Sequence, residues 1–189
     1  MHFDYAIIGG SFDPFHRGHL HLGKELLSRH IATSIAYVPC ANHHFKKCIT
    51  LSFGIRLALI QKSLDQYPGL VAWDYDSTNY SGYTADLMLR LYQSHPSLTF
   101  TFVIGADNIA QLSQWYNYRW LVDHVHFTIL PRPEYKIDQH LLEGLRHEVI
   151  DIPLSQISSA EVRKSVQKGL SIDHLVPTEI VDEVRRLYV

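Results

Sequence analysis

The sequence predicts an α/β fold with a doubly wound, mainly parallel sheet. Strand and helix patterns alternate along the chain, which is typical of right-handed β-α-β crossovers. A glycine-rich turn directly follows the first apolar run, and 46% of the 189 residues are hydrophobic, enough to bury a sizeable core. We therefore expect one Rossmann-like domain over residues 1–189, divided into a core over 1–153 and a small helical part over 154–189.

Three short apolar runs in the first half of the chain predict strands over residues 4–9, 35–38 and 70–74. Helical periodicity predicts helices over 18–30, from Ser52 to about Tyr67 and from Tyr83 to about Tyr92. Ser52 is the expected N-cap of the middle helix, since serine oxygen accepts hydrogen bonds from the first free N–H groups.

The second half of the chain continues the alternation. Residues 98–105 predict a strand rich in β-branched and aromatic side chains, and 126–130 predict another that ends before Pro131. A helix-like piece near 138–147 and a short strand near 148–152 follow. The last forty residues carry two helical patterns, over 159–168 and 178–187.

The run from Gly9 to His19 carries the strongest functional signal. It lies between the first predicted strand and the first predicted helix, and its glycines allow backbone or ligand to approach closely. N–H groups at the start of a helix carry partial positive charge and bind phosphate, and His16 and His19 lie at that same end. The glycine and lysine spacing fits neither a Walker A loop nor the dinucleotide G-x-G-x-x-G pattern.

The segment from Ile157 to Arg163 predicts a second helix start. Ser158 and Glu161 have the spacing of a capping box, and Arg163 lies about one turn into the helix. A guanidinium binds phosphate oxygens in a fork, so this helix end suits an anionic ligand. Alone, the pattern favours a plain capped helix with a solvated arginine, because this spacing is common, and only together with the first motif does it favour a ligand.

Both segments resemble signatures of the nucleotidyltransferase superfamily. Gly10 to His19 matches G-x-F-D-P-x-H-x-G-H at every fixed position, and Ile157 to Arg163 resembles I-S-[ST]-T-x-[IV]-R with Ala160 in place of threonine. The resemblance implies transfer of a nucleotide from ATP or CTP to an acceptor that carries a phosphate.

Further segments resemble the nicotinate-nucleotide adenylyltransferases in particular. The chain matches their I-G-x-D-x…W-Y stretch, and it matches S-Y-T and R-P-G with Gly82 and Glu134 as departures. The resemblance implies transfer of AMP from ATP to nicotinate mononucleotide, with Mg²⁺ bound together with ATP. Trp115 offers a flat surface for a pyridine ring, and Asp107 is expected to accept a hydrogen bond from a ribose hydroxyl.

The resemblance assigns three groups of residues. Those expected to act in catalysis, by positioning and charge stabilisation without a covalent intermediate, are His16, His19, Lys46 and Arg163. Those expected to bind ATP are Gly9, Gly10, Ser11, Phe12, Gly18, His19, Gly105, Asp107, Ile157, Ser158, Ser159 and Arg163. Those expected to bind the acceptor are Asn42, Tyr83, Thr84, Trp115, Tyr116 and Arg132.

The segment 39–47 departs most from these enzymes, which usually carry P-P-H-K there. Lys46 is the best match for the triphosphate lysine, with Lys47 second. Arg56 falls within a predicted helix and is expected to be mainly structural.

Zinc is an alternative ligand for the same segment, because it holds two cysteines and two histidines. Cys40 and Cys48 flank His43 and His44, but their spacing matches no common zinc pattern, and no protein-held metal is expected.

Composition argues against several partners. A net charge of −2 without a long basic run argues against nucleic acid, and no apolar run approaches the length of a membrane span. The first strand begins almost at once, which leaves no room for a signal peptide, so a cytoplasmic protein is expected. The sequence does not indicate an oligomeric state.

Three alternatives for the function stay open. Nicotinamide mononucleotide differs from the expected acceptor by one amide. Phosphopantetheine adenylyltransferases share both signatures but usually have threonine where His16 stands. A nucleotide sensor that has kept the fold and lost catalysis is the third.

Overall fold

The fold is built on a six-stranded sheet with strand order β3-β2-β1-β4-β5-β6, and all neighbouring pairs are parallel. The computed structural model describes residues 2–41, 49–77, 81–132, 135, 137–153 and 155–189. The strands are β1 (Phe3–Gly10), β2 (Ala32–Pro39), β3 (Leu70–Ala72), β4 (Phe100–Gly105), β5 (His126–Leu130) and β6 (Arg146–Val149). The predicted doubly wound parallel sheet is confirmed.

Helices connect the strands and continue beyond the last of them. The α-helices are α1 (Arg17–Ser28), α2 (Phe53–Leu64), α3 (Thr84–Ser94), α4 (Ala106–Ile109), α5 (Tyr118–His124), α6 (Ser159–Gln167) and α7 (Val181–Leu187). Single 3-10 turns are η1 (Leu112–Gln114), η2 (Gln139–Leu142) and η3 (Thr178–Ile180). No helix in the described part of the chain is long and apolar enough to cross a membrane.

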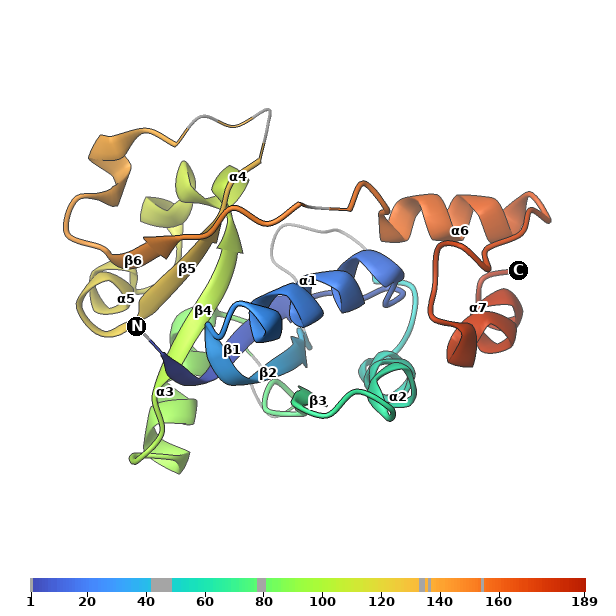
Figure 1. Ribbon diagram of the computed structural model, residues 1–189, viewed down its shortest axis with the longest axis horizontal. Coiled ribbons are helices and arrows are strands. Elements are labelled where there is room, and N and C mark those ends of the chain that lie inside the picture. The colour runs from blue at the N-terminus through green and yellow to red at the C-terminus, as the bar shows by residue number, and fades with distance from the viewer. Residues whose placement is uncertain (1, 42–48, 78–80, 133–134, 136, 154) are drawn as a thin grey trace.

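Successive side chains along a strand pack alternately into two separate hydrophobic cores, one on each face of the sheet. Ala6 and Ile8 of β1 belong to the core under α1 and α2, whereas Ile7 belongs to the core under α3 and α5. This period of two follows from the strand geometry and explains why the central strands are apolar on both faces. A third apolar cluster joins α2 to α6 and α7, which lie beyond one end of α1 and away from the sheet (Figure 1).

The chain changes direction beside β1, and this positions the site. It runs from β1 outward to β2 and β3, then returns to place β4 on the other side of β1. A crevice opens at such a switch point, outside the carboxyl ends of the two strands, and ligands of open α/β sheets bind there. Here those ends are Gly10 and Gly105.

The sequence prediction is wrong around residues 138–147. A 3-10 turn over Gln139–Leu142 replaces the predicted helix, and β6 begins at Arg146 rather than at 148. Gly144 has φ +81°, which ends the turn, and Arg146 pairs with His126 of β5. Strand pairing therefore overrides the local helical pattern.

Smaller differences concern helix ends. Ser52 precedes α2, but its side chain makes no capping hydrogen bond, and α2 ends at Leu64 instead of about Tyr67. The sequence did not predict α4, η1 or α5, which have four, three and seven residues and are too short to show a period.

Candidate active site

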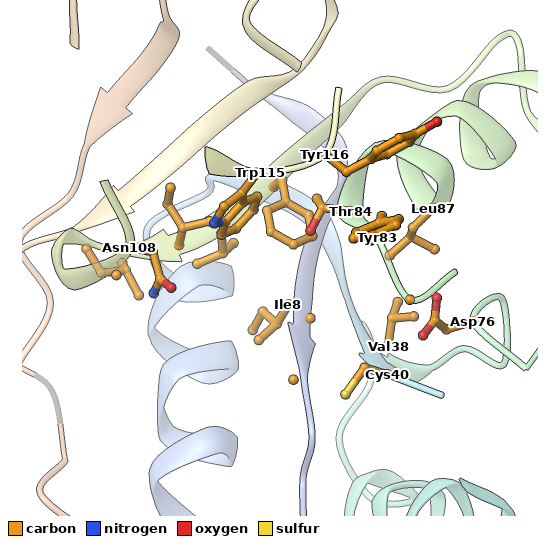
Figure 2. A pocket seen from close by; sticks show the side chains of 18 of the residues that line it. Ile8, Val38, Cys40, Asp76, Tyr83, Thr84, Leu87, Asn108, Trp115 and Tyr116 are labelled. Carbon is orange, nitrogen blue, oxygen red and sulfur yellow. The ribbon is translucent and has the colours of Figure 1, made fainter. Parts of the chain in front are cut away.

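A pocket of about 380 Å³ opens at the switch point between the ends of β1 and β4. Figure 2 shows its lining. Eight of the residues expected from the sequence line it: Gly9, Gly10, Tyr83, Thr84, Gly105, Trp115, Tyr116 and Arg132. The pocket therefore gathers residues from the first strand, the start of α3, the end of β4 and the segment before α5.

Aromatic rings form one wall of this pocket. The Tyr83 and Tyr116 rings stack with centroids 4.6 Å apart, and the partly buried Trp115 meets Phe102 edge-on at 6.5 Å. Tyr83 and Thr84 stand at the very start of α3, where helical N–H groups lack intrahelical partners. A flat anionic ring would find both stacking surface and hydrogen-bond donors there.

The start of α1 forms a second, more polar region. His16 occupies the N-cap position, and its backbone N–H donates to Nδ1 of His19 at 3.2 Å. The two imidazole rings stack with centroids 3.5 Å apart. Because Nδ1 of His19 accepts this bond, the proton of the neutral His19 ring is on Nε2, which makes that nitrogen a donor.

The His16 ring is buried and uncharged at neutral pH. Its exposed fraction is 6%, and its Nδ1 has no hydrogen-bond partner among the described residues. Burial lowers the pKa of His16 to about 4, because the charged imidazolium is disfavoured away from water. His16 can therefore donate a hydrogen bond to an anion but brings no fixed positive charge.

The second predicted motif lies against this turn. Oγ of Ser159 donates to the Pro14 carbonyl at 2.9 Å, and Nη1 of Arg163 donates to the Asp13 carbonyl at 2.6 Å. The Ser158 side chain caps α6 by accepting the Glu161 N–H at 3.1 Å, as its spacing predicts. The two motifs, about 150 residues apart in the sequence, are thus in direct contact.

The family follows from comparison with known proteins. The model of the cytidylyltransferase-like family matches residues 7–165. The chain belongs to this family. Among its relatives are a probable nicotinate-nucleotide adenylyltransferase of Clostridium tetani, 29% identical with 96% of each chain covered, and one of Herpetosiphon aurantiacus, 30% identical with 97% and 98% covered.

A solved structure extends the likeness over the whole fold. The nicotinic acid mononucleotide adenylyltransferase of Plasmodium falciparum, complexed with NaAD, is 26% identical, with a TM-score of 0.82 over 98% of this chain and 96% of its own. The resemblance to the nicotinate-nucleotide adenylyltransferases that the sequence motifs indicated is confirmed. The protein is therefore an enzyme of a nucleotidyltransferase family.

One ion pair at the pocket links residues that the family resemblance assigns to different substrates. Nε of Arg132 lies 2.8 Å from Oδ1 of Asp107, and both side chains are partly exposed. Arg132 lines the pocket, whereas Asp107, the second residue of α4, is not among the lining residues. The pair thus ties the segment after β5 to the start of α4 at the edge of the pocket.

A buried arginine holds the segments around the site together. Arg56 is 1% exposed and donates hydrogen bonds to three carbonyls, at distances of 2.6 to 3.1 Å, those of Ser11, Cys40 and Leu51. A buried guanidinium with three carbonyl acceptors is a structural element, so the prediction that Arg56 is mainly structural is confirmed.

The pocket also contains residues that the sequence did not single out, among them Asp76, Asn108 and Gln114. Asp76 is 3% exposed, and its Oδ2 accepts the Ala41 N–H at 2.6 Å. No motif surrounds Asp76, and only the pairing of β2 with β3 brings the two segments together. Asn108 stands directly after Asp107, within the segment already recognised.

Several expected site residues lie outside the pocket lining, around the start of α1 and α6: Ser11, Phe12, His16, Gly18, His19, Ile157, Ser158, Ser159 and Arg163. Gly9 and Gly10 connect the two regions, because they end β1 and precede the turn. The expected catalytic Lys46, its alternative Lys47, the expected acceptor contact Asn42 and the zinc candidates His43, His44 and Cys48 lie outside the described residues.

Proposed function

We propose that the chain transfers AMP from ATP to nicotinate mononucleotide and releases pyrophosphate. The observation that carries this proposal is that two regions adjoin at the end of β1: Gly9 and Gly10 line the aromatic pocket, and the chain continues from them into the turn that begins α1. A dinucleotide product needs a site of this kind, apolar at one end and suited to phosphate at the other. Relatives over nearly the whole chain are named for this reaction.

The acceptor would lie in the aromatic pocket. Its pyridine ring would stack on Trp115 beside the Tyr83–Tyr116 pair, and its carboxylate would accept N–H groups near Thr84 and Tyr116. These donors are backbone N–H groups at the start of α3 and in the segment between η1 and α5, so they require no further cation.

The triphosphate would lie at the start of α1. An oxygen of the acceptor phosphate attacks the α-phosphorus, the new P–O bond forms, and the bond to the β-phosphate breaks so that pyrophosphate leaves. The nucleophile is already anionic near neutral pH, and no general base is required. His16 and His19 would hold the phosphates by N–H donors, with His19 nearest the bridging oxygen where charge develops.

Arg163 would stabilise the leaving pyrophosphate. Its guanidinium has five N–H donors, and one of them donates to the Asp13 carbonyl. This bond directs the side chain toward the turn that begins α1. Lys46 is proposed for the same role on the basis of the sequence resemblance.

Mg²⁺ would enter with ATP, held by phosphate oxygens and water. Among the described residues no group of three or more His, Cys, Asp or Glu side chains could hold a metal ion. Bound with ATP, the ion would reduce the negative charge on the phosphates that the anionic acceptor approaches.

Pyrophosphate release by the purified protein tests the proposal. ATP and Mg²⁺ are supplied with nicotinate mononucleotide, nicotinamide mononucleotide or phosphopantetheine in parallel. Release with nicotinate mononucleotide, and much less with its amide, is expected. Release with phosphopantetheine alone would replace the proposed acceptor, and ATP binding without release in any arm would favour a nucleotide sensor.

A further inference from the structure

The Asp13 carboxylate joins three segments at the start of the ATP-binding turn. Asp13 is 4% exposed, and its Oδ2 accepts the Thr50 N–H at 2.7 Å. Its Oδ1 accepts the Leu51 N–H at 3.2 Å and the Tyr188 hydroxyl at 2.5 Å. The Asp13 carbonyl accepts Arg163, so this one residue connects the turn with α6, with the segment before α2 and with the end of the chain.

The protonation states of Asp13 and Tyr188 favour the hydrogen bond between them. Burial acts to raise the pKa of Asp13, but the hydrogen bonds from Tyr188, Thr50 and Leu51 outweigh it and hold the pKa below its ordinary value. Burial and the neighbouring Asp13 charge raise the pKa of the Tyr188 phenol far above its ordinary value. The carboxylate is therefore ionised and the phenol protonated at neutral pH, which makes their bond charge-assisted.

Tyr188 stands at the end of the chain and is nevertheless buried. Its exposed fraction is 4%, whereas that of the following Val189 is 99%. The ring packs in the cluster that joins α2, α6 and α7. The family match ends at residue 165, so Tyr188 lies outside the segment that the family model describes.

Tyr188 binds the Asp13 carboxylate through its side chain. The Asp13 carboxylate also accepts a hydrogen bond from the Thr50 side chain and from the backbone N–H groups of Thr50 and Leu51, and most substitutions leave the two backbone donors in place. The Tyr188 hydroxyl is a side-chain donor that a single substitution removes. Asp13 stands directly before Pro14, whose carbonyl is bound by Ser159, and three residues before His16.

We propose that Tyr188 is a positioning residue for ATP: through Asp13 it fixes the turn that presents His16, His19 and the start of α1 to the triphosphate. The inference rests on the proposed use of ATP at this turn. It assigns a role in nucleotide binding to the last turn of the chain, which contributes no residue to the acceptor pocket.

The test compares Tyr188→Phe with Tyr92→Phe. Both substitutions remove one tyrosine hydroxyl, and the Tyr92 hydroxyl donates to the His124 carbonyl at 3.1 Å on the opposite side of the sheet from α1. Tyr188→Phe is expected to lower kcat/KM for ATP about tenfold and to leave KM for nicotinate mononucleotide within about twofold, because one bond to a charged group is lost. Tyr92→Phe is expected to change neither parameter.

Melting temperatures separate positioning from loss of structure. Similar melting temperatures with a loss confined to ATP support the inference. Equal kinetics of the two variants, or an equal loss for both substrates that follows the unfolded fraction, would overturn it. Asp13→Asn, which keeps the size of the side chain and removes its charge, is expected to show the same split and provides a second variant if Tyr188→Phe does not fold.

Calorimetric binding of ATP in the absence of acceptor separates this inference from the proposed function. A wild-type protein that binds ATP but releases no pyrophosphate overturns the proposed function alone. A weaker ATP affinity of Tyr188→Phe relative to Tyr92→Phe would then still support the positioning role, and equal affinities would overturn it.

Discussion

The proposed acceptor pocket and the proposed ATP-binding turn adjoin at the end of β1 but differ in the groups that form them. The pocket has aromatic walls, and Tyr116 is 52% exposed there. The turn is buried and polar, and backbone carbonyls of residues 13 and 14 are held by side chains of α6. In the proposed function the pocket would recognise a ring through side-chain surface, whereas the turn would bind charge through the position of its backbone. Substitutions should therefore affect the two substrates separately.

The largest effect is expected from a substitution at the proposed ATP-binding turn. His19→Ala should lower kcat by roughly 100-fold or more, the effect of removing one preorganised donor from a developing charge. Steady-state kinetics with both substrates measures it. His140→Ala, at an exposed site in η2, is the control. A kcat near that of the wild type would remove His19 from the proposed mechanism.

The buried His16 should make stability depend on pH. Its pKa is lowered from 6.5 to about 4 in the folded protein, so the unfolded chain binds a proton more readily between these two values. The free energy of unfolding should then fall by about 2 kcal/mol between pH 7 and pH 5. Urea titrations across this range measure it, and His16→Gln should flatten the dependence. An unchanged slope in that variant would contradict a buried, neutral His16.

Trp115→Ala should weaken binding of the acceptor, whereas His19→Ala acts on the reaction of ATP. Loss of the stacking surface should raise KM for nicotinate mononucleotide about tenfold and leave KM for ATP nearly unchanged. Trp115→Phe, which keeps a flat ring, should recover most of the difference. A variant that loses ATP affinity and keeps acceptor affinity would reverse the assignment of the pocket.

The smallest effect is expected where the two regions meet. Arg132→Gln breaks the ion pair with Asp107. Both side chains of this pair are partly exposed. Such pairs contribute little, so the free energy of unfolding should change by less than about 1 kcal/mol. Chemical denaturation measures it. A larger loss would mean that the pair holds the rim of the pocket together.

Much of the fold could be predicted because its signals are local. The apolar run before Gly9 and the alternation of strands and helices are legible within a few residues, and they are sufficient for the sheet and its switch point. The helix predicted near 138–147 failed because β5 pairs with Arg146, an interaction that no local window contains. The short helices between 106 and 124 give no period to detect.

A candidate site could be proposed from the sequence only where residues stand inside motifs. His16, Trp115 and Arg163 were proposed in this way. Asp76 and Tyr188 carry no such pattern, since their partners are Ala41 and Asp13, 35 and 175 residues away in the chain. Their contacts depend on how separate segments meet in three dimensions.

The order of synthesis gives the Asp13 cluster a further consequence. All six strands have been made once residue 149 is added, whereas the groups that fix the turn before α1 come from Ser159, Arg163 and Tyr188. The turn before α1 is therefore made early, but its hydrogen bonds to Arg163 and Tyr188 need segments that follow the whole sheet in the chain. The proposed ATP-binding turn acquires these bonds only after all six strands have been synthesised.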